Sequence, residues 1–296
     1  MKVCRTVILL CLSLCLLVSG TAGAVDLDAK NKGLYISPLR QQRVVAAGKA
    51  TNGNLTIGNQ TDKPMTVTLS VKQFSVTDYD YDYVFSEPKH DWLKFATTEV
   101  QISPHENKKV DYTLTIPQKT TPGGYYLSLV ASTRVPGPGL SATVEAASLL
   151  YIKVAGNLVR TGVLRNDALP FFVTGSTIPY KFDVEDTGNV YFTAYFYGQL
   201  EDVFGVSKQP ETGTSHLLMP GAVRTIEGSI PTPMLPGVYK ATYGYKVDFA
   251  QIVVTKSAYV LFIPPWSVAA LICILLFVRW LQQKRHKPQR STKQID

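Results

Sequence analysis

The stretch Ile116–Tyr126, IPQKTTPGGYY, follows a rule that the chain repeats at Ile230–Lys240, IPTPMLPGVYK. In both copies Ile-Pro is followed by four residues, Pro-Gly, one residue and Tyr. The two copies start 114 residues apart, which is about the length of one small β-sandwich domain. The spacing therefore predicts two tandem domains of the same kind.

Each part of the repeat has a structural reason. The proline after isoleucine ends a strand because it has no amide for the ladder, and Pro-Gly then forms a turn. The tyrosine opens the next strand, where its ring covers the end of a sandwich and its hydroxyl bonds to backbone. We therefore predict a structural corner, used once per domain, rather than a functional motif. The corner residues are Pro117, Pro122, Gly123 and Tyr125 in the first copy and Pro231, Pro236, Gly237 and Tyr239 in the second.

Between residues 25 and 257, short runs of alternating apolar and polar residues predict β-strands, and the apolar residues do not recur with the helical period of 3.6 residues. In one stretch Tyr180, Phe182 and Val184 alternate with charged residues, and a turn at 186–189 leads to an aromatic strand at 190–197. A second stretch has a turn at 58–64 and then an alternating row from Met65 to Val71. We predict an all-β ectodomain of two tandem immunoglobulin-like β-sandwiches, at 25–155 and 156–257, with their boundary near Gly156.

The N-terminus has the features of a signal peptide. Lys2 and Arg5 are followed by an apolar run at 7–18 that is too short to span a bilayer, and Ala22-Gly23-Ala24 suits signal peptidase. We predict a signal peptide at 1–24. The alternative is an uncleaved anchor.

The C-terminal end contains an apolar run, residues 260–278, that has no charge and is long enough to span a membrane. Trp266 and Trp280 are predicted to lie at the two membrane interfaces, and the tail after them is basic. We predict a transmembrane helix at 258–281, a cytoplasmic tail at 282–296, and a single-pass type I protein of the cell membrane with its ectodomain outside.

The formal net charge of +8 is concentrated in the two ends. Basic and acidic residues nearly balance between them, so we predict no nucleic-acid partner; nucleic-acid binding by the basic tail is the alternative. Cys4, Cys11 and Cys15 lie in the predicted signal peptide and Cys273 in the predicted span. Disulfides therefore cannot hold the ectodomain together, and this favours a bacterial source.

This layout resembles the WxL-interacting protein family of Gram-positive bacterial surfaces. The resemblance is carried by LYISPLRQQ from Leu34, the TIPQKTTPGGYYLSLV segment, and the second copy running into the span and RWLQQKRHK. It implies two immunoglobulin-like domains, the first associated with peptidoglycan and the second with a partner or host surface.

No catalytic pattern accompanies this layout. His90, His105, His216 and His286 are scattered, and the sequence has no His-x-x-x-His or Cys-x-x-Cys pair, no Gly-x-Ser-x-Gly elbow and no phosphate-binding glycine loop. We therefore predict a protein that is not an enzyme and needs no cofactor.

The segment DYDYDYVF alternates acidic and aromatic residues. Its spacing resembles the start of an EF-hand loop, but Tyr83 stands at the glycine position and Lys89 at the glutamate position, so a standard EF-hand is excluded. A strand or hairpin is favoured over a calcium site, and contact of the tyrosines with carbohydrate or protein is a third possibility. The calcium candidates are Asp78, Asp80 and Asp82, and the binding candidates are Tyr79, Tyr81 and Tyr83.

The remaining candidate surface is a hairpin tip at 135–140 between two long strands. Together these features predict a membrane-anchored surface protein that contacts a cell-wall polymer or a secreted protein. The alternative is an accessory or scaffold subunit of a membrane assembly, such as a secretion or pilus system.

Overall fold

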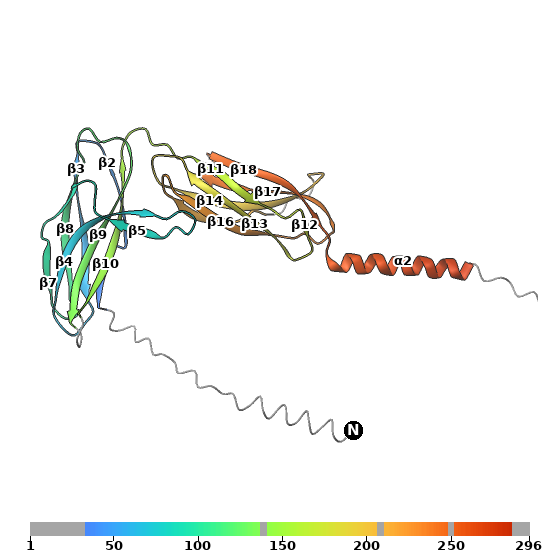
Figure 1. Ribbon diagram of the computed structural model, residues 1–296, viewed down its shortest axis with the longest axis horizontal. Helices are drawn as coiled ribbons and strands as arrows, with labels where there is room; N and C mark the ends of the chain where they lie inside the picture. The colour runs from blue at the N-terminus through green and yellow to red at the C-terminus, as the bar shows by residue number, and fades with distance from the viewer. Residues whose placement is uncertain (1–32, 137–140, 206–209, 248–251, 286–296) are drawn as a thin grey trace, which may run out of the picture.

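The computed structural model describes residues 33–136, 141–205, 210–247 and 252–285. In these ranges the chain forms two β-sandwiches followed by one helix (Figure 1). The prediction of an all-β chain with one apolar C-terminal helix is confirmed. The predicted signal peptide and residues 286–296 of the predicted tail lie outside the described residues.

The first sandwich consists of two sheets. One has the order β1 (Leu34–Ser37), β3 (Ala50–Asn59), β8 (Asn107–Thr115) and β6 (Leu93–Phe95). The other has the order β2 (Arg40–Val45), β10 (Ser141–Val154), β9 (Gly123–Pro136), β4 (Met65–Val76) and β5 (Tyr83–Ser86), and β7 (Glu99–Ile102) also pairs with β4. All pairs are antiparallel except β2 with β10.

The second sandwich repeats this plan. One sheet has the order β11 (Gly162–Ala168), β13 (Thr177–Asp186) and β16 (Val223–Pro231). The other has the order β12 (Phe172–Val173), β18 (Ile252–Phe262), β17 (Gly237–Val247), β14 (Phe192–Asp202) and β15 (Thr212–Leu218). Here too the short second strand, β12, runs parallel to the last strand, β18.

The repeated corner occupies the same place in both sandwiches. It joins β8 to β9 in the first and β16 to β17 in the second, and in each case the chain passes from one sheet to the other. The hydroxyl of Tyr125 donates to the Thr121 carbonyl at 3.0 Å, and that of Tyr239 donates to the Leu235 carbonyl at 2.9 Å. Both corners therefore close with the same hydrogen bond to the residue four positions earlier.

Alternating residues fill the two cores. Tyr180, Phe182 and Val184 are buried in the second core, and Val67 and Leu69 in the first. Asp183 departs from the alternation because it is also buried, where its carboxylate accepts bonds from Asn166 and Thr225. A buried carboxylate is tolerated when hydrogen bonds replace those it made with water.

The two turns that the sequence marks are sheet-to-sheet connections. The turn at 58–64 joins β3 to β4, and the turn at 186–189 joins β13 to β14, and in both cases the flanking strands belong to different sheets. Local sequence predicts the turn but not the partner strand, because pairing is decided by the packing of the whole sandwich.

Asn189, in the second of these turns, connects the two domains. Its amide nitrogen donates to the carbonyls of Pro122 and Asn157, at 3.3 and 2.9 Å, and its side-chain oxygen accepts the Val159 amide at 2.8 Å. Its own carbonyl accepts the Gly124 amide at 2.7 Å. One residue thus ties the corner of the first sandwich and the interdomain segment to the second sandwich.

The helix α2 (Pro265–Arg285) begins later than the predicted span, which started at residue 258. Residues 258–262 belong to β18, where Val260 and Phe262 are buried in the second core. The apolar run is therefore shared between a core strand and a helix. In the ranges that the structure describes, one helical stretch, Pro265–Gln283, is long and apolar enough to cross a membrane, and it does not pack against the sandwiches.

Asp186, at the end of β13, is a buried carboxyl group with an unusual environment. One oxygen accepts the Gly188 amide at 2.8 Å, while the other has no hydrogen-bond partner among the described residues. Burial raises the pKa of Asp186 from 3.8 to about 7. The folded protein therefore keeps a proton on Asp186 at pH values where the unfolded chain has released it.

This pKa shift predicts a pH-dependent stability. Between about pH 4 and pH 7 the unfolded chain ionises at Asp186 and the folded chain does not, so the free energy of unfolding falls as the pH rises. Relative to Asp186→Asn, we expect the wild type to lose about 1–3 kcal/mol between pH 5 and pH 8. Urea unfolding of the full chain in detergent, followed by circular dichroism, measures this difference. A difference that is constant with pH would contradict it, and Asp80→Asn is the exposed control.

Candidate functional site

The ladder between β4 and β9 stops before β9 ends. The strands pair over six positions, from Gln73–Leu127 to Thr68–Ser132, whereas β9 continues to Pro136. From Thr68 back to Met65, β4 pairs with β7 on its opposite edge. A gap therefore opens between the start of β4 and the end of β9, and we call it the β4–β9 gap.

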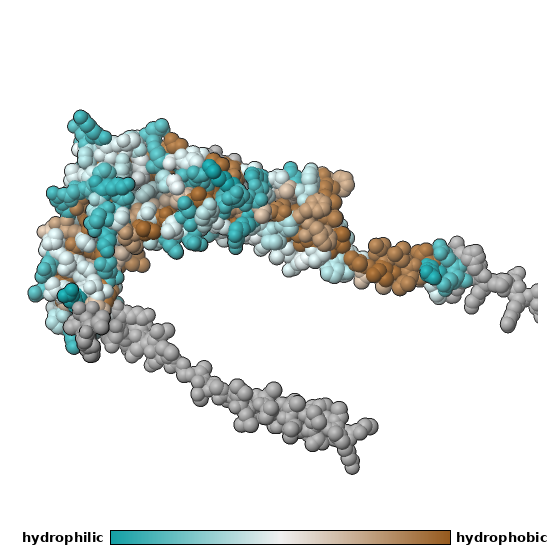
Figure 2. Space-filling model, in the orientation of Figure 1, coloured by the Kyte–Doolittle hydropathy of each residue, from teal (hydrophilic) through white to brown (hydrophobic). Residues whose placement is uncertain are grey.

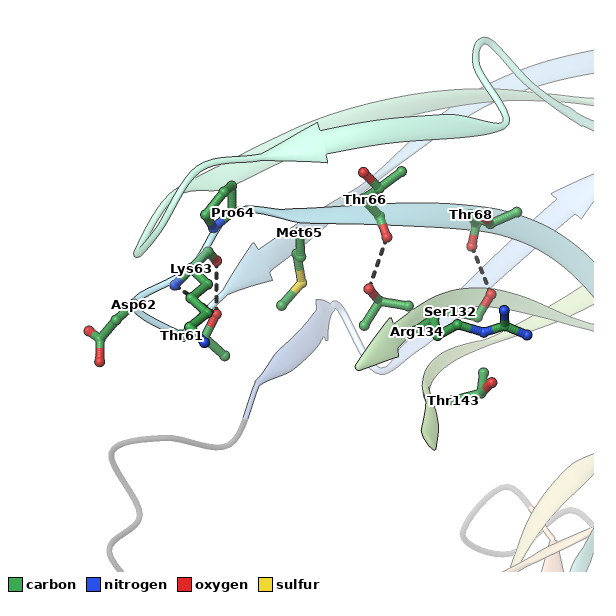
Figure 3. Close-up of a pocket in the computed structure, with 11 residues that line it drawn as sticks. Thr61, Asp62, Lys63, Pro64, Met65, Thr66, Thr68, Ser132, Arg134 and Thr143 are labelled. Atoms are coloured by element: carbon green, nitrogen blue, oxygen red, sulfur yellow. Dashed lines mark hydrogen bonds between the residues drawn. The ribbon is translucent and has the colours of Figure 1, made fainter. Parts of the chain in front are cut away.

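Side-chain hydroxyls bridge the narrow part of this gap. Thr133 donates to the Thr66 carbonyl at 2.9 Å, and Ser132 donates to the Thr68 carbonyl at 3.3 Å, as the dashed lines in Figure 3 show. Each of these two carbonyls of β4 thus accepts a hydrogen bond from a side-chain hydroxyl of β9. The strands are held apart in a defined geometry.

The turn at the rim of the gap is held by a buried side chain. The Asn59 amide nitrogen donates to the carbonyls of Lys63, Ile102 and Ser103, at 2.7, 3.2 and 3.1 Å. Its oxygen accepts the Thr61 amide at 2.9 Å. The turn that carries Asp62 and Lys63 is therefore fixed from inside, and the rim is preformed.

Beyond the bridges the gap widens into a cavity of about 770 Å³. Its lining is mostly hydroxyl-bearing, with Met65 as an apolar element and charged groups at the rim (Figure 3). The lining residues are Thr61, Asp62, Lys63, Pro64, Met65, Thr66, Thr68, Ser132, Thr133, Arg134 and Thr143. The cavity suits a polar, extended ligand better than an apolar one.

The backbone of β9 is available inside this gap. Backbone amide and carbonyl groups of alternate residues point to the same side of an antiparallel strand, so Arg134 directs its peptide groups as Ser132 does, toward β4. Among the described strands, Arg134 pairs only with Thr143 of β10, on the other side. A sheet edge is therefore exposed within the sandwich.

In the second sandwich the corresponding ladder runs to the last described residue of β17. β14 and β17, the counterparts of β4 and β9, pair over nine positions, up to Val247 at the end of β17. By the 114-residue offset of the repeated corner, Val247 corresponds to Thr133, and the counterpart of Arg134 lies outside the described residues.

The acidic and aromatic segment lies elsewhere, at the domain junction. Residues 77–82 form the turn between β4 and β5, closed by the Thr77 amide on the Asp82 carbonyl at 2.9 Å. The Tyr79 amide donates to the Val223 carbonyl at 2.7 Å, and Asp78 accepts the Val223 amide at 2.8 Å. The turn therefore docks on the second sandwich.

Tyr79 and Tyr81 have φ values of 68° and 64°, which are unfavourable for residues with a side chain. The docking contacts maintain this conformation. The Tyr81 hydroxyl accepts the Met219 amide, and the Arg224 guanidinium lies 4.4 Å from the centre of the Tyr81 ring. Burial raises the pKa of Tyr81.

The candidate calcium ligands are not brought together. Among the described residues, no three His, Cys, Asp or Glu side chains form a group that could hold a metal ion. Asp78, Asp80 and Asp82 lie in a turn in which the Asp78 carboxylate already accepts a backbone amide. Alternate aspartates can bind one calcium ion only if the loop that carries them wraps around the ion. This turn instead lies along β16, to which it is bridged by Tyr79 and Arg224.

The three tyrosines of the segment also separate. Tyr81 belongs to a junction cluster with Phe74, Tyr126, Tyr151 and Tyr191. Tyr79 and Tyr83 remain 53% and 42% exposed, so they alone are accessible for outside contacts. Tyr83 also bonds to the Tyr151 hydroxyl at 3.2 Å and stacks edge-on against Phe74, so it supports the junction as well.

The β4–β9 gap was not predicted from the sequence. The sequence feature nearest to the gap is the unusual length of β9 and β10, which pair up to Pro136–Ser141. This feature predicted only the hairpin tip. Tip residues 137–140 lie outside the described residues. Thr66, Thr133 and Arg134 belong to no recognisable motif, and they become neighbours only because the β4–β9 ladder ends at Thr68 and Ser132.

No protein-family model and no curated protein matches the chain. Among solved structures, it is similar to the class 5 fimbriae chaperone CfaA at 11% identity and a TM-score of 0.45, with 78% of this chain and 100% of that chain covered. It is also similar to the E. coli chaperone DraB, at 12% identity, a TM-score of 0.37, and coverage of 77% and 96%. A third similarity is to a Salmonella enterica structure of the SafA pilin with the SafB chaperone, at 17% identity, a TM-score of 0.37 and coverage of 77% and 96%. The similarity concerns the overall fold, and no ligand or activity of this chain follows from it.

The docked turn predicts different effects for two neighbouring aspartates. Asp78→Ala removes the acceptor of the Val223 amide, so we expect faster hydrogen exchange at Val223 and a loss of about 1 kcal/mol. Asp80→Ala, in the same turn and exposed, should change neither. Exchange mass spectrometry of the full chain measures both. Equal exchange at Val223 in the two variants would show that the Asp78 bond does not hold the junction.

Proposed function

We propose that the protein is a membrane-anchored, non-enzymatic binding protein of the cell surface, and that its first sandwich captures an extended segment of a partner protein in the β4–β9 gap. The observation that carries this proposal is the exposed edge of β9 within a preformed, hydroxyl-lined cavity. Extended peptides bind such edges by adding a strand, with backbone hydrogen bonds for affinity and side-chain pockets for specificity.

The chemistry of the gap favours a polypeptide. Arg134 offers one amide and one carbonyl toward the gap, which is the pattern that an added strand pairs with. Thr133 and Ser132 hydroxyls already occupy the β4 carbonyls, so the guest would pair with β9 and lie over the threonines. Arg134 and Lys63 at the rim suit a segment that carries carboxylates.

The position of the gap suits presentation away from a membrane. Gly124 contacts the second domain, and Arg134 lies further along β9 by about 33 Å at the rise of a strand. The helix leaves the opposite end of the molecule (Figure 1). A chain anchored through α2 would hold the β4–β9 gap at its outer end.

A cell-wall polymer is the second candidate ligand. The resemblance to WxL-interacting proteins supports it, since that family's first domain is associated with peptidoglycan, and hydroxyl side chains hydrogen-bond to sugars as readily as to peptides. The experiment below separates the two ligands.

A proline at position 134 tests whether an extended peptide pairs with the backbone of β9. Arg134→Pro removes the amide that faces the gap. The hydrogen bonds between β9 and β10 at this point are made by the residues on either side of Arg134. We therefore expect β9 to remain a strand, because proline is tolerated at such an edge position. We select random extended peptides on phage against the full chain in nanodiscs. We expect Arg134→Pro to lose their binding at least about tenfold, or about 1.4 kcal/mol, and Arg134→Ala, which keeps the amide, to lose much less.

Insoluble peptidoglycan sacculi form the second arm of this test. Binding of selected peptides that Arg134→Pro abolishes and Arg134→Ala retains supports strand addition. Equal loss in both variants would mean that the charge, and not the β9 edge, is recognised. Sedimentation with sacculi that neither variant changes would place ligand binding outside the β4–β9 gap and overturn the peptide proposal.

A further inference from the structure

The end of the second sandwich that joins α2 carries exposed apolar side chains on three separate loops. Phe171 lies before β12, Phe204 in the turn after β14, and Met234 and Leu235 between β16 and β17. Their exposed fractions are 72%, 86%, 86% and 63%. We call these residues, with Phe172 and Val203, the proximal rim.

Strand register places all three loops at the same end. Asp202, the last residue of β14, pairs with Tyr239 near the start of β17, and Gly237 pairs with Phe262, the last residue of β18. Phe172 pairs with Leu261, next to the same end of β18. The loops that follow or precede these positions therefore surround the point at which the chain leaves for the helix.

The connection between the second sandwich and the helix is short, so the rim stays close to the start of α2. The Ile263 amide donates to the Val173 carbonyl at 3.0 Å, so residue 263 is still part of the sandwich, and α2 begins at Pro265. Two residues reach about 7 Å at most. The polar layer on each side of the hydrocarbon core is about 5–8 Å thick, so a spanning α2 holds the rim within reach of that layer.

The sequence of the rim loops suits this location. No charged residue occurs at 168–180 or 228–239, which contain two of the three rim loops, or at 257–278, whereas the Phe204 loop follows Glu201 and Asp202. Figure 2 shows hydrophobic surface at this end of the sandwich, continuing onto the helix. Exposed phenylalanine, leucine and methionine at loop tips are costly in water but favourable at the headgroup boundary.

We infer that the proximal rim is a membrane-docking surface, which inserts its three apolar loop tips into the outer headgroup layer of the bilayer that α2 spans. The inference rests on the anchoring part of the proposed function. A helix with a two-residue connection would by itself leave the ectodomain free to tilt. Three additional contacts around the helix restrict the tilt and hold the second sandwich upright on the membrane.

Depth-dependent fluorescence quenching tests this inference. The full chain, with its four native cysteines replaced by serine, receives one new cysteine and an NBD label, and is reconstituted in phosphatidylcholine vesicles. Phe204→Cys and Leu235→Cys report on the rim. Val163→Cys, 45% exposed at the other end of the same sandwich, is the matched control. Leu275→Cys, in the middle of α2, reports on the anchor.

We expect labels at 204 and 235 to emit at shorter wavelength than the label at 163 and to be quenched by a headgroup spin label. The label at 275 should be quenched by a spin label deep in the acyl chain. If the label at 275 is quenched while the labels at 204 and 235 behave like the label at 163, the docking inference is overturned and the membrane anchor is supported. If 275 is not quenched either, the anchoring part of the proposed function fails, and the docking inference fails with it.

A loop-tip variant provides the second measurement. In the chain labelled at Phe171→Cys, the substitutions Phe204→Ser, Met234→Ser and Leu235→Ser should abolish headgroup quenching, because the remaining rim residues no longer insert together. All three sites are exposed, so the circular dichroism spectrum should not change. Headgroup quenching at 171 that survives the triple substitution would show that α2 alone positions this end, and would overturn a role for the loop tips.

Discussion

The arrangement of the two sandwiches depends on the hydrogen bonds of one residue, Asn189. Its side chain and carbonyl join Pro122 and Gly124 of the first corner, Asn157 and Val159 of the interdomain segment, and the β13–β14 turn. Around it the aromatic junction cluster buries Phe74, Tyr151 and Tyr191. A junction that combines directional bonds with a buried apolar cluster fixes the angle between domains, whereas a purely apolar contact allows sliding.

The acidic and aromatic turn completes this junction from the side of the first sandwich. Its tyrosines with positive φ are held by the second sandwich, so the conformation of residues 77–82 and the interdomain contact depend on each other. Without disulfides, the ectodomain obtains a rigid junction from these polar contacts and from stacked rings. The proposed function requires such a junction, because the binding site has to be held at a constant distance from the membrane.

The two sandwiches share one strand plan and use it differently. In the first, the β4–β9 ladder ends at Thr68 and Ser132, and the gap exposes a strand edge at the outer end. In the second, the β14–β17 ladder continues to Val247, the last described residue of β17, and the apolar residues gather on the loops beside α2. The two proposed functions, capture of a ligand and placement on the membrane, thus fall on different copies of one fold.

The sequence by itself determined the all-β class and the C-terminal apolar helix, because alternation, turn residues and uncharged runs are local properties of the chain. The prediction went wrong at the start of the helix, since Val260 and Phe262 are as apolar as membrane residues but are buried in a sandwich core. Only the tertiary structure decided the partners of strands. It separated Asp78, Asp80 and Asp82 from any common site, used Tyr81 in the junction, and opened the gap beside Arg134. Each of these depends on contacts between residues far apart in the chain, and no local pattern encodes the free energy of such contacts.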